Sequence, residues 1–194
     1  GLGAYAWRGF SGFLAAYDRV ASLFDTLEAQ RALAEAVLEA QADHGVVYTE
    51  IAISPDLAAG ADAGRWREHL AAIGEAADAV EARRGIAARW VATCIRNLGP
   101  ERAEACARLA VEAGEARVIG LGLAGDERVF APGDFRRAFD AAREAGLGLT
   151  AHAGEFAGAE SVAAALDDLG AQRIDHGVRA AEDAALRERA AADT

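Results

Sequence analysis

Two histidines and a carboxylate of this sequence stand where strands would end. Residues 147–151 form an apolar, strand-like run, and His152 follows it at once, with Glu155 in the loop beyond. A second strand-like run, residues 172–175, leads into His176. Neutral imidazole is the commonest metal ligand, and a carboxyl group can transfer protons as a general acid or base. These positions would bring two histidines and a carboxylate into one pocket. Taken alone, His152 is either a metal ligand or a hydrogen-bonded structural residue.

The elements that must position these residues alternate along the chain. The patterns predict helices at 10–24, 26–42, 65–83, 100–112, 132–145 and 160–169, and strands at 46–53, 87–95, 117–123, 147–151 and 172–176. This succession predicts an α/β fold with a parallel sheet covered by helices. Periodicity alone leaves open whether the sheet is a closed barrel or an open, doubly wound one. In a barrel, the carboxyl ends of the strands converge on one mouth, so the two histidines would meet there.

The composition of the 194 residues excludes several classes of function. A net charge of −11 argues against a nucleic-acid-binding surface, because such surfaces attract phosphates with basic residues. No apolar run approaches the roughly 18 residues that cross a membrane, and the chain shows no leader pattern, so we expect a cytoplasmic protein. Cys94 and Cys106 stand far apart without a CxxC pair, and we expect both to be buried free thiols.

Four short motifs follow one another, each at an expected strand or at its end. They read Tyr-Thr-Glu-Ile at 48–51, Leu-Ala-Gly-Asp-Glu at 123–127, His-Ala-Gly-Glu at 152–155 and Ile-Asp-His-Gly at 174–177. In order and spacing they resemble the adenosine and adenine deaminases of the zinc amidohydrolase superfamily, over nearly the whole chain. The resemblance implies an α/β fold of the TIM (β/α)8 barrel type, of which roughly strands 2 to 6 are represented. Residues 1–194 would then form a single, partial barrel domain.

The resemblance also implies a role for each site residue. His152 would bind one zinc ion (Zn²⁺), and Glu155 would protonate the purine ring nitrogen while water adds to the neighbouring carbon. His176 would orient the zinc-bound water and stabilise the charge that develops during the attack. The backbone amide of Gly125 would contact the purine, and a side chain there would block that close approach.

The family pattern has parts that this sequence lacks. An H-x-H pair that supplies two zinc ligands on the first strand cannot be found, nor can an aspartate pair after the last strand, and Gly122 stands where relatives commonly carry aspartate. An eightfold barrel also takes about 250 residues. The chain opens on glycine rather than methionine. We therefore expect a chain that is incomplete at both ends and inactive by itself, with the remaining zinc ligands in the missing termini.

Five further polar residues are expected to serve structure. Asp126 and Glu127 would shape their loop, and Glu50, inside an otherwise apolar strand, would need a partner if it pointed inward. His44 precedes a strand at the end opposite the chemistry, and His69 lies on a helix among charged residues. We expect both histidines to face solvent.

For the whole protein, the resemblance implies hydrolytic deamination of a 6-aminopurine, a small-molecule nucleoside or base. Residues 10–24 resemble the region that covers the pocket in nucleoside-accepting relatives, which favours conversion of adenosine to inosine and ammonia. Asp175 points the other way, because the adenine-specific branch often has aspartate there; it could equally be a structural partner of Arg173. Adenine deaminase and aminofutalosine deaminase are alternatives. A non-catalytic, purine-binding barrel is an alternative of another class.

Overall fold

The computed structural model describes residue 7 and residues 9–192 of the chain. Contacts between residues divide the chain into two compact units. The first comprises Gly1–Val47 with Glu68–Ala87, and the second comprises Tyr48–Arg67 with Ala88–Thr194. Apart from Ala87, every residue of the sheet belongs to the second unit, and so do all the residues predicted to carry chemistry.

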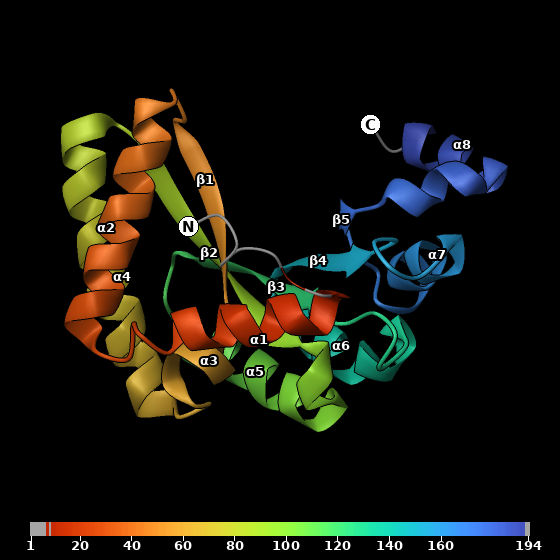
Figure 1. Cartoon of the computed structure of the whole chain (residues 1–194), viewed down its shortest axis with the longest axis horizontal. Helices are drawn as coiled ribbons and strands as arrows, with labels where there is room; N and C mark the ends of the chain where they lie inside the picture. The colour runs from red at the N-terminus through yellow and green to blue at the C-terminus, as the bar shows by residue number, and fades with distance from the viewer. Residues whose placement is uncertain (1–6, 8, 193–194) are drawn as a thin grey trace. The chain divides into compact units, whose positions relative to one another are not determined.

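The first unit is helical. α1 spans Gly9–Ala21, α2 spans Leu27–Asp43, and α4 spans Ala63–Arg84, of which the part from Glu68 onward belongs to this unit (Figure 1). Thr26 begins α2 as its N-cap, because its hydroxyl accepts the otherwise unpaired amide hydrogen of Ala29. Acidic residues of α2 form ion pairs with two arginines at the end of α4: Arg83 with Glu35 and Glu39, and Arg84 with Glu39 and Asp43. The three helices predicted in this region are therefore confirmed.

The prediction that His69 faces solvent is wrong. Its residue is only 5% exposed, and its Nδ1 atom lies 2.6 Å from Oε1 of Gln30 on α2. His69 shares the helix face of Leu70 and Ile73, which are buried at the spacing of successive helical turns. The charged residues beside it in the sequence, Arg67 and Glu68, are exposed, so they did not indicate the burial of His69. Burial lowers the pKa of His69 to about 4, because the charged imidazolium loses its hydration. His44, by contrast, is exposed as predicted.

The second unit is built on a five-stranded sheet whose spatial order is the sequence order. The strands are β1 (Tyr48–Ile53), β2 (Ala87–Ile95), β3 (Val118–Ala124), β4 (Gly148–Ala153) and β5 (Arg173–His176). β2, β3, β4 and β5 pair in parallel. A doubly wound sheet reverses its strand order at a switch point, whereas a barrel adds each strand beside the last. The observed order is therefore that of a barrel.

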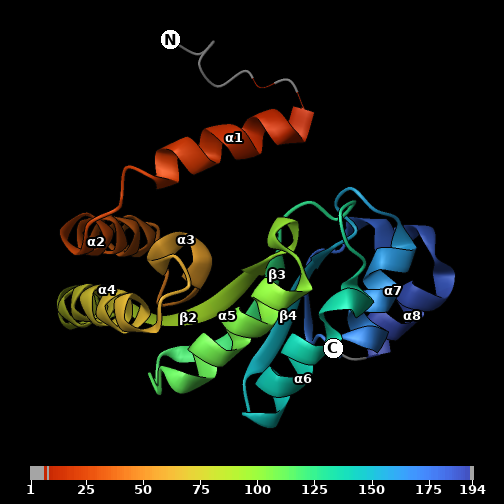
Figure 2. The same ribbon diagram turned by 90° about the horizontal axis from the view of Figure 1, so that it is seen from below.

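The helices of this unit lie between its strands or after the last one. They are α3 (Pro55–Ala59), α5 (Pro100–Glu112), α6 (Arg136–Glu144), α7 (Ala159–Asp168) and α8 (Ala184–Ala192). α5, α6 and α7 pack along the sheet, each against β3, β4 or β5 (Figure 2). The single helix predicted over 132–145 begins as a 3₁₀ turn, Pro132–Phe135, before α6. α3, which has only five residues, was not predicted, and no bounds were predicted for α8.

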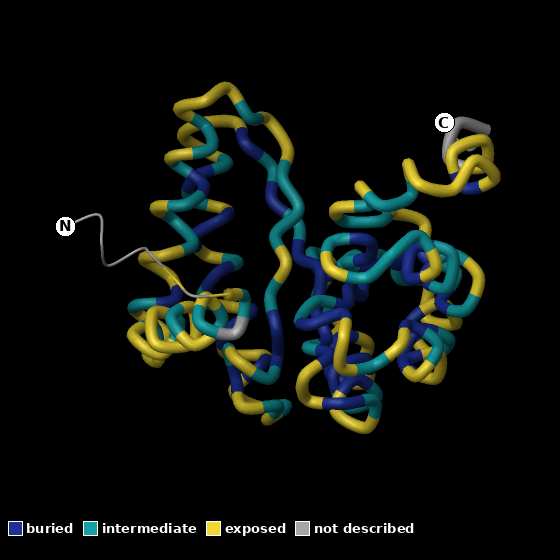
Figure 3. Tube along the Cα trace, turned by 45° about the vertical axis from the view of Figure 1, so that its right-hand side comes forward, coloured by how far each residue is buried: buried dark blue, intermediate teal, exposed yellow. Residues whose placement is uncertain are grey.

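The two faces of the sheet differ in burial. Figure 3 colours the chain by burial, and buried residues lie along the strands and on parts of the helices. Along β4, Leu149, Ala151 and Ala153 are at most 4% exposed, whereas Thr150 and His152 on the opposite face are partly exposed. Alternation of this kind is expected when side chains point to opposite faces at successive residues. The buried face carries the core beneath the helices. The partly exposed face carries the polar residues, so chemistry and packing are assigned to different sides of one strand.

The prediction for the two cysteines is met by the described structure. Cys94 and Cys106 are both buried and unpaired by a disulfide. Across the described residues, each helix is too short or too polar to span a bilayer.

Candidate active site

The ends of β4 and β5 bring the predicted residues together. In the parallel register His152 lies opposite Asp175, and Ala153 lies opposite His176. Parallel neighbours end at the same edge of a sheet, and side chains two residues apart share a face. Thr150 and His152 of β4 therefore face the same way as Asp175 of β5. Nothing but strand register is needed to assemble this part of the site.

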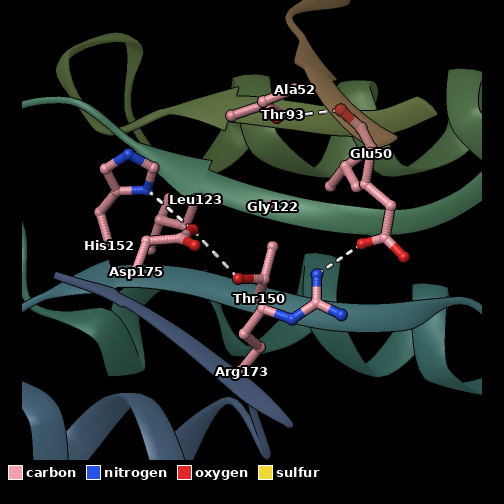
Figure 4. Close-up of a pocket in the computed structure, with 10 residues that line it drawn as sticks. Glu50, Ala52, Thr93, Gly122, Leu123, Thr150, His152, Arg173 and Asp175 are labelled. Carbon is pink, nitrogen blue, oxygen red and sulfur yellow. Dashed lines mark hydrogen bonds and ion pairs between the residues drawn. The ribbon is translucent and has the colours of Figure 1, made fainter. Parts of the chain in front are cut away.

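One carboxylate connects two residues of β4. Oδ2 of Asp175 lies 3.1 Å from Nδ1 of His152 and accepts a hydrogen bond of 3.0 Å from the hydroxyl of Thr150 (Figure 4). The side chains of His152 and Asp175 are about one third exposed, at 32% and 37%. The contact with His152 holds the pKa of Asp175 below its usual value, so the carboxylate is charged at neutral pH. The imidazole is thus oriented with Nδ1 toward Asp175 and its other nitrogen away from it.

His176 and Glu155 form a second pair at the same edge. Nε2 of His176 lies 3.4 Å from Oε2 of Glu155, and both side chains are partly exposed. The rings of His152 and His176 meet edge to face, with centroids 5.0 Å apart and planes at 66°. His176 adopts a φ of +68°, a left-handed backbone conformation that costs a non-glycine residue free energy. Such a residue at a strand end places its side chain where regular strand geometry would not.

The loop that carries Glu155 is held by Glu127. That residue is 6% exposed, and its two carboxylate oxygens accept five hydrogen bonds. The donors are the backbone amides of Gly154, Glu155, Phe156 and Ala157 and the hydroxyl of Ser161, at 2.7, 2.8, 2.7, 3.2 and 2.8 Å. Burial by itself would raise the pKa of Glu127, but these hydrogen bonds outweigh it and the pKa is lowered. Glu127 was predicted to shape its own loop, whereas the loop that its carboxylate holds is the one after β4.

Gly125 lies just beyond β3, at the same sheet edge. Its φ is +104°, and a Cβ atom there would lie 2.6 Å from Oδ1 of Asn97 and 3.1 Å from the backbone nitrogen of Arg96. Only glycine fits both the backbone angle and the space. Oδ1 of Asn97 accepts the amide hydrogen of Asp126 at 3.0 Å, which fixes this turn. Contact of Gly125 with a purine stays a prediction.

Glu50 has the partner that an inward carboxylate needs. Arg173 donates a 2.5 Å hydrogen bond to Glu50, and the hydroxyl of Tyr48 donates another of 2.8 Å. Arg173, the larger influence, and Tyr48 together lower the pKa of Glu50. Arg173 thus takes Glu50 as its ion-pair partner, while Asp175 pairs with His152. This ion pair joins β1 to β5 across the face that also carries Thr93 and His152 (Figure 4).

Arg96 is a residue of this region that the sequence patterns did not reveal. It is fully buried and donates hydrogen bonds to the backbone carbonyls of His152 and Phe130, at 2.7 and 2.9 Å. Arg96 follows β2 directly, in a 3₁₀ turn spanning Arg96–Leu98. An arginine immediately after a buried strand was the available signal. Its partners could not be read from the sequence, since His152 is 56 residues away.

A family model described as adenosine deaminase matches residues 4–194 of the chain. This chain belongs to the adenosine deaminase family. Among curated proteins, the adenine deaminase of Chelativorans sp. is 48% identical over 191 residues, and that of Sinorhizobium medicae is 49% identical over 193 residues. Each match covers 97% of this chain but 58% of the relative. The chain therefore spans little more than half the length of these curated relatives.

Solved structures agree with this membership of the adenosine deaminase family. The adenine deaminase from Arthrobacter aurescens superposes with a TM-score of 0.86 at 29% identity, over 95% of this chain and 56% of that one. An amidohydrolase from Burkholderia ambifaria, solved with bound Zn, gives a TM-score of 0.81 at 29% identity, over 86% of this chain and 46% of that one. The five-stranded sheet is part of a TIM barrel, as the sequence predicted.

Within the described part of this deaminase-family chain, no group of three histidine, cysteine, aspartate or glutamate side chains is arranged to hold a metal ion. A catalytic zinc site takes about three protein ligands, and His152, the carboxylate at its Nδ1 atom and the neighbouring ring of His176 are not arranged as such a set. The described residues thus supply one candidate ligand together with its orienting partner.

Proposed function

We propose that this chain supplies the proton-transfer half of a site for the hydrolytic deamination of a 6-aminopurine. The observation that carries the proposal is the convergence of His152, Glu155 and His176 at one edge of the sheet. Glu155 lies 3.4 Å from His176, and the ring centroids of His152 and His176 are 5.0 Å apart. Membership of the adenosine deaminase family supports it. We also propose that residues 1–194 belong to one barrel domain.

Adenine, rather than adenosine, is the proposed substrate. The sequence patterns favoured adenosine because residues 10–24 resembled a pocket cover, and the structure describes that region as the helix α1 in the first unit. Two curated relatives that are 48% and 49% identical carry the name adenine deaminase. Asp175, the one residue that favoured adenine in the sequence, lies against His152 and so belongs to the site. The names of these relatives and the position of Asp175 favour adenine more strongly than the resemblance of residues 10–24 favours adenosine.

Zinc is the proposed cofactor, and His152 fits the part of a ligand. Metal-binding histidines commonly direct their second nitrogen to a carboxylate, which fixes the tautomer and the ring orientation. The carboxylate of Asp175 lies in the corresponding place, 3.1 Å from Nδ1 of His152. Zinc, when bound, supplies a water molecule that is nucleophilic at neutral pH. The curated relatives extend beyond the region that matches this chain. We propose that the remaining zinc ligands come from such additional sequence.

Glu155 is the proposed general acid. Deamination adds water across the bond between the amino-bearing carbon and the neighbouring ring nitrogen, and this nitrogen must gain a proton as the carbon gains its oxygen. Glu155 would donate that proton and would regain one from the attacking water. The hydroxyl proton of the adduct then passes to the amino group as its carbon–nitrogen bond breaks, which releases ammonia and leaves the 6-oxopurine. His176 lies 3.4 Å from the Glu155 carboxylate and can donate a hydrogen bond to the oxygen on which charge develops.

The test uses a full-length protein that carries this chain. Steady-state rates on adenine, adenosine, deoxyadenosine and aminofutalosine should give the highest kcat/KM for adenine, by at least about tenfold over adenosine, a difference of roughly 1.4 kcal/mol in transition-state binding. Metal analysis should find one zinc ion per chain. A higher kcat/KM for adenosine would overturn the choice of substrate. Purine binding without turnover or metal would instead support a binding barrel.

A further inference from the structure

Glu127 lies in the loop after β3, yet its carboxylate contacts the loop after β4, which carries Glu155. The residues from Gly154 to Gly158 lie between β4 and α7, outside any helix or strand, so their amides have no regular backbone partners. Four successive amides of this segment donate to Glu127 instead, at 2.7 to 3.2 Å. Successive amides that converge on one anion form a concave nest, which is ordinarily a site for a bound anion. Here the anion is a side chain of the same protein.

The Glu127 carboxylate acts on Glu155 itself. The amide of Glu155 donates to Oε2 of Glu127 at 2.8 Å, and the amides on either side, of Gly154 and Phe156, donate at 2.7 Å each. The backbone at Glu155 is therefore fixed at three successive peptide groups. Its side chain leaves that backbone and ends 3.4 Å from His176.

Arg96 holds the same strand end from the preceding side. Its guanidinium donates to the carbonyl of His152 at 2.7 Å, two residues before the first amide that Glu127 holds. Both residues are buried, Arg96 fully and Glu127 to 6% exposure. A buried cation on the carbonyl side and a buried anion on the amide side thus clamp residues 152–157.

We propose that Glu127 is a positioning residue for the deamination reaction, which sets the location of Glu155 by holding the amides of residues 154–157. The proposal rests on the proposed function, since it assigns the acid role to Glu155. Displacement of a reacting group by about 1 Å can cost on the order of a hundredfold in rate. The rigidity of this loop is therefore a kinetic property and not only a contribution to folding.

Glu127→Gln in the full-length protein is the first test. Glutamine has nearly the same shape, but one of its two terminal atoms becomes an amide donor facing backbone amides, so part of the loop must move. We expect kcat to fall about a hundredfold, with zinc content unchanged and KM within about threefold. Glu160→Gln is the matched control, because Glu160 is an exposed neighbour that accepts a single amide bond, from Gly158 at 3.0 Å. Its kcat should stay within about twofold.

A double-mutant cycle separates positioning from general damage. If Glu127 acts through Glu155, Glu127→Gln should change the residual rate of a Glu155→Gln protein by less than about threefold, since the positioned group is already lost. Equal losses in both backgrounds would overturn the proposal, as would no loss in the unmodified background. Ser161→Ala provides the same comparison if Glu127→Gln does not fold. It removes one of the five donors and should cost about three- to tenfold in kcat, again only when Glu155 is present.

Amide hydrogen exchange tests the loop without any substitution. The amides of residues 154–157 should exchange at least about a hundredfold more slowly than those of an unstructured loop, because they donate to a buried carboxylate. Exchange at the unprotected rate would overturn the proposal. This measurement does not depend on turnover. A protein inactive on every purine would therefore refute the proposed function while exchange still reported on the clamp, and an active protein with equal losses in the cycle would refute the positioning role alone.

Discussion

Asp175 faces His152, the residue that we propose as a zinc ligand. In the proposed enzyme, Asp175→Asn keeps the shape of the side chain but removes the charge that faces Nδ1 of His152, at 3.1 Å. We expect zinc affinity to fall about 10- to 100-fold, as is usual when the carboxylate partner of a metal-binding histidine is lost. Competition with a chelator measures it. Asp168→Asn is the control, since Asp168 pairs with Arg136 on the surface, and equal affinities in the two variants would contradict the assignment.

The two candidate roles at the end of β4 predict different losses. Glu155→Gln should lower kcat by roughly 10² to 10⁴ while zinc stays bound, because a general acid contributes about that much. His152→Ala should instead lose the metal. Metal content and turnover are measured on the same preparations. A glutamine variant that lost zinc, or one that kept nearly full activity, would show that the roles are assigned wrongly.

At the residue scale, a single sequence predicts best those residues whose position in a strand decides their neighbours. His152 and His176 were predicted because each ends a strand, and the register of β4 and β5 then makes them neighbours. Glu127 was predicted to shape a loop, yet the loop it holds begins 27 residues later in the chain. Contacts of that kind depend on tertiary packing, which leaves no periodic signal in a single sequence.

At the scale of elements, the strands and long helices of the barrel were predicted closely. The bounds of β2 and α5 coincide with those predicted, because both have a continuous or strongly periodic apolar pattern and α5 begins at Pro100. α3 was not predicted, since Pro55 and Asp56 suit a turn as well as a helix start. The error on His69 came from its neighbours in sequence, where the helical face decides burial.

His69 predicts how the pairing of α2 with α4 responds to acid. Its pKa is lowered to about 4 in the folded chain and returns to its usual value near 6.5 on unfolding. As pH falls below 6.5 the unfolded chain takes up a proton that the folded chain does not. The free energy of unfolding should therefore fall by about 2 kcal/mol between pH 7.5 and pH 5, and by about 3 kcal/mol in all once pH passes below 4.

Urea unfolding at several pH values tests this dependence. His69→Asn can still donate to Gln30 but does not titrate, so its free energy of unfolding should change less between pH 7.5 and pH 5, by about the 2 kcal/mol assigned to His69. Carboxylates titrate alike in both proteins and cancel in the difference. His44→Asn is the control, because His44 is exposed, and it should retain the full dependence. Identical pH dependence in all three proteins would remove His69 as the cause.

At the scale of the whole molecule, the winding of the sheet decides which residues can meet. Strand order equals sequence order from β1 to β5, so each new βα unit adds its carboxyl end beside the last. Residues of one site can then be far apart in sequence, as Glu50 and Arg173 are at a separation of 123 residues. The motifs predicted this arrangement because they recur at strand ends. They could not predict the ion pair, since it crosses the sheet between edge strands.

His176 adopts a left-handed backbone conformation, with a φ of +68°, that costs folding free energy. It is also a residue that we propose takes part in the reaction. His176→Gly deletes an imidazole, yet it should leave the free energy of unfolding equal or up to about 1 kcal/mol higher, because glycine adopts this angle without strain. His44→Gly replaces a histidine at a φ of −93° and also removes the 2.8 Å hydrogen bond between its imidazole and the carbonyl of Ala40, so it should destabilise by about 0.5 to 1 kcal/mol. Urea unfolding of both variants compares them, and equal destabilisation would contradict the argument. Folding stability alone would favour glycine at position 176, so under the proposed function the imidazole of His176 serves the reaction at a cost in folding free energy.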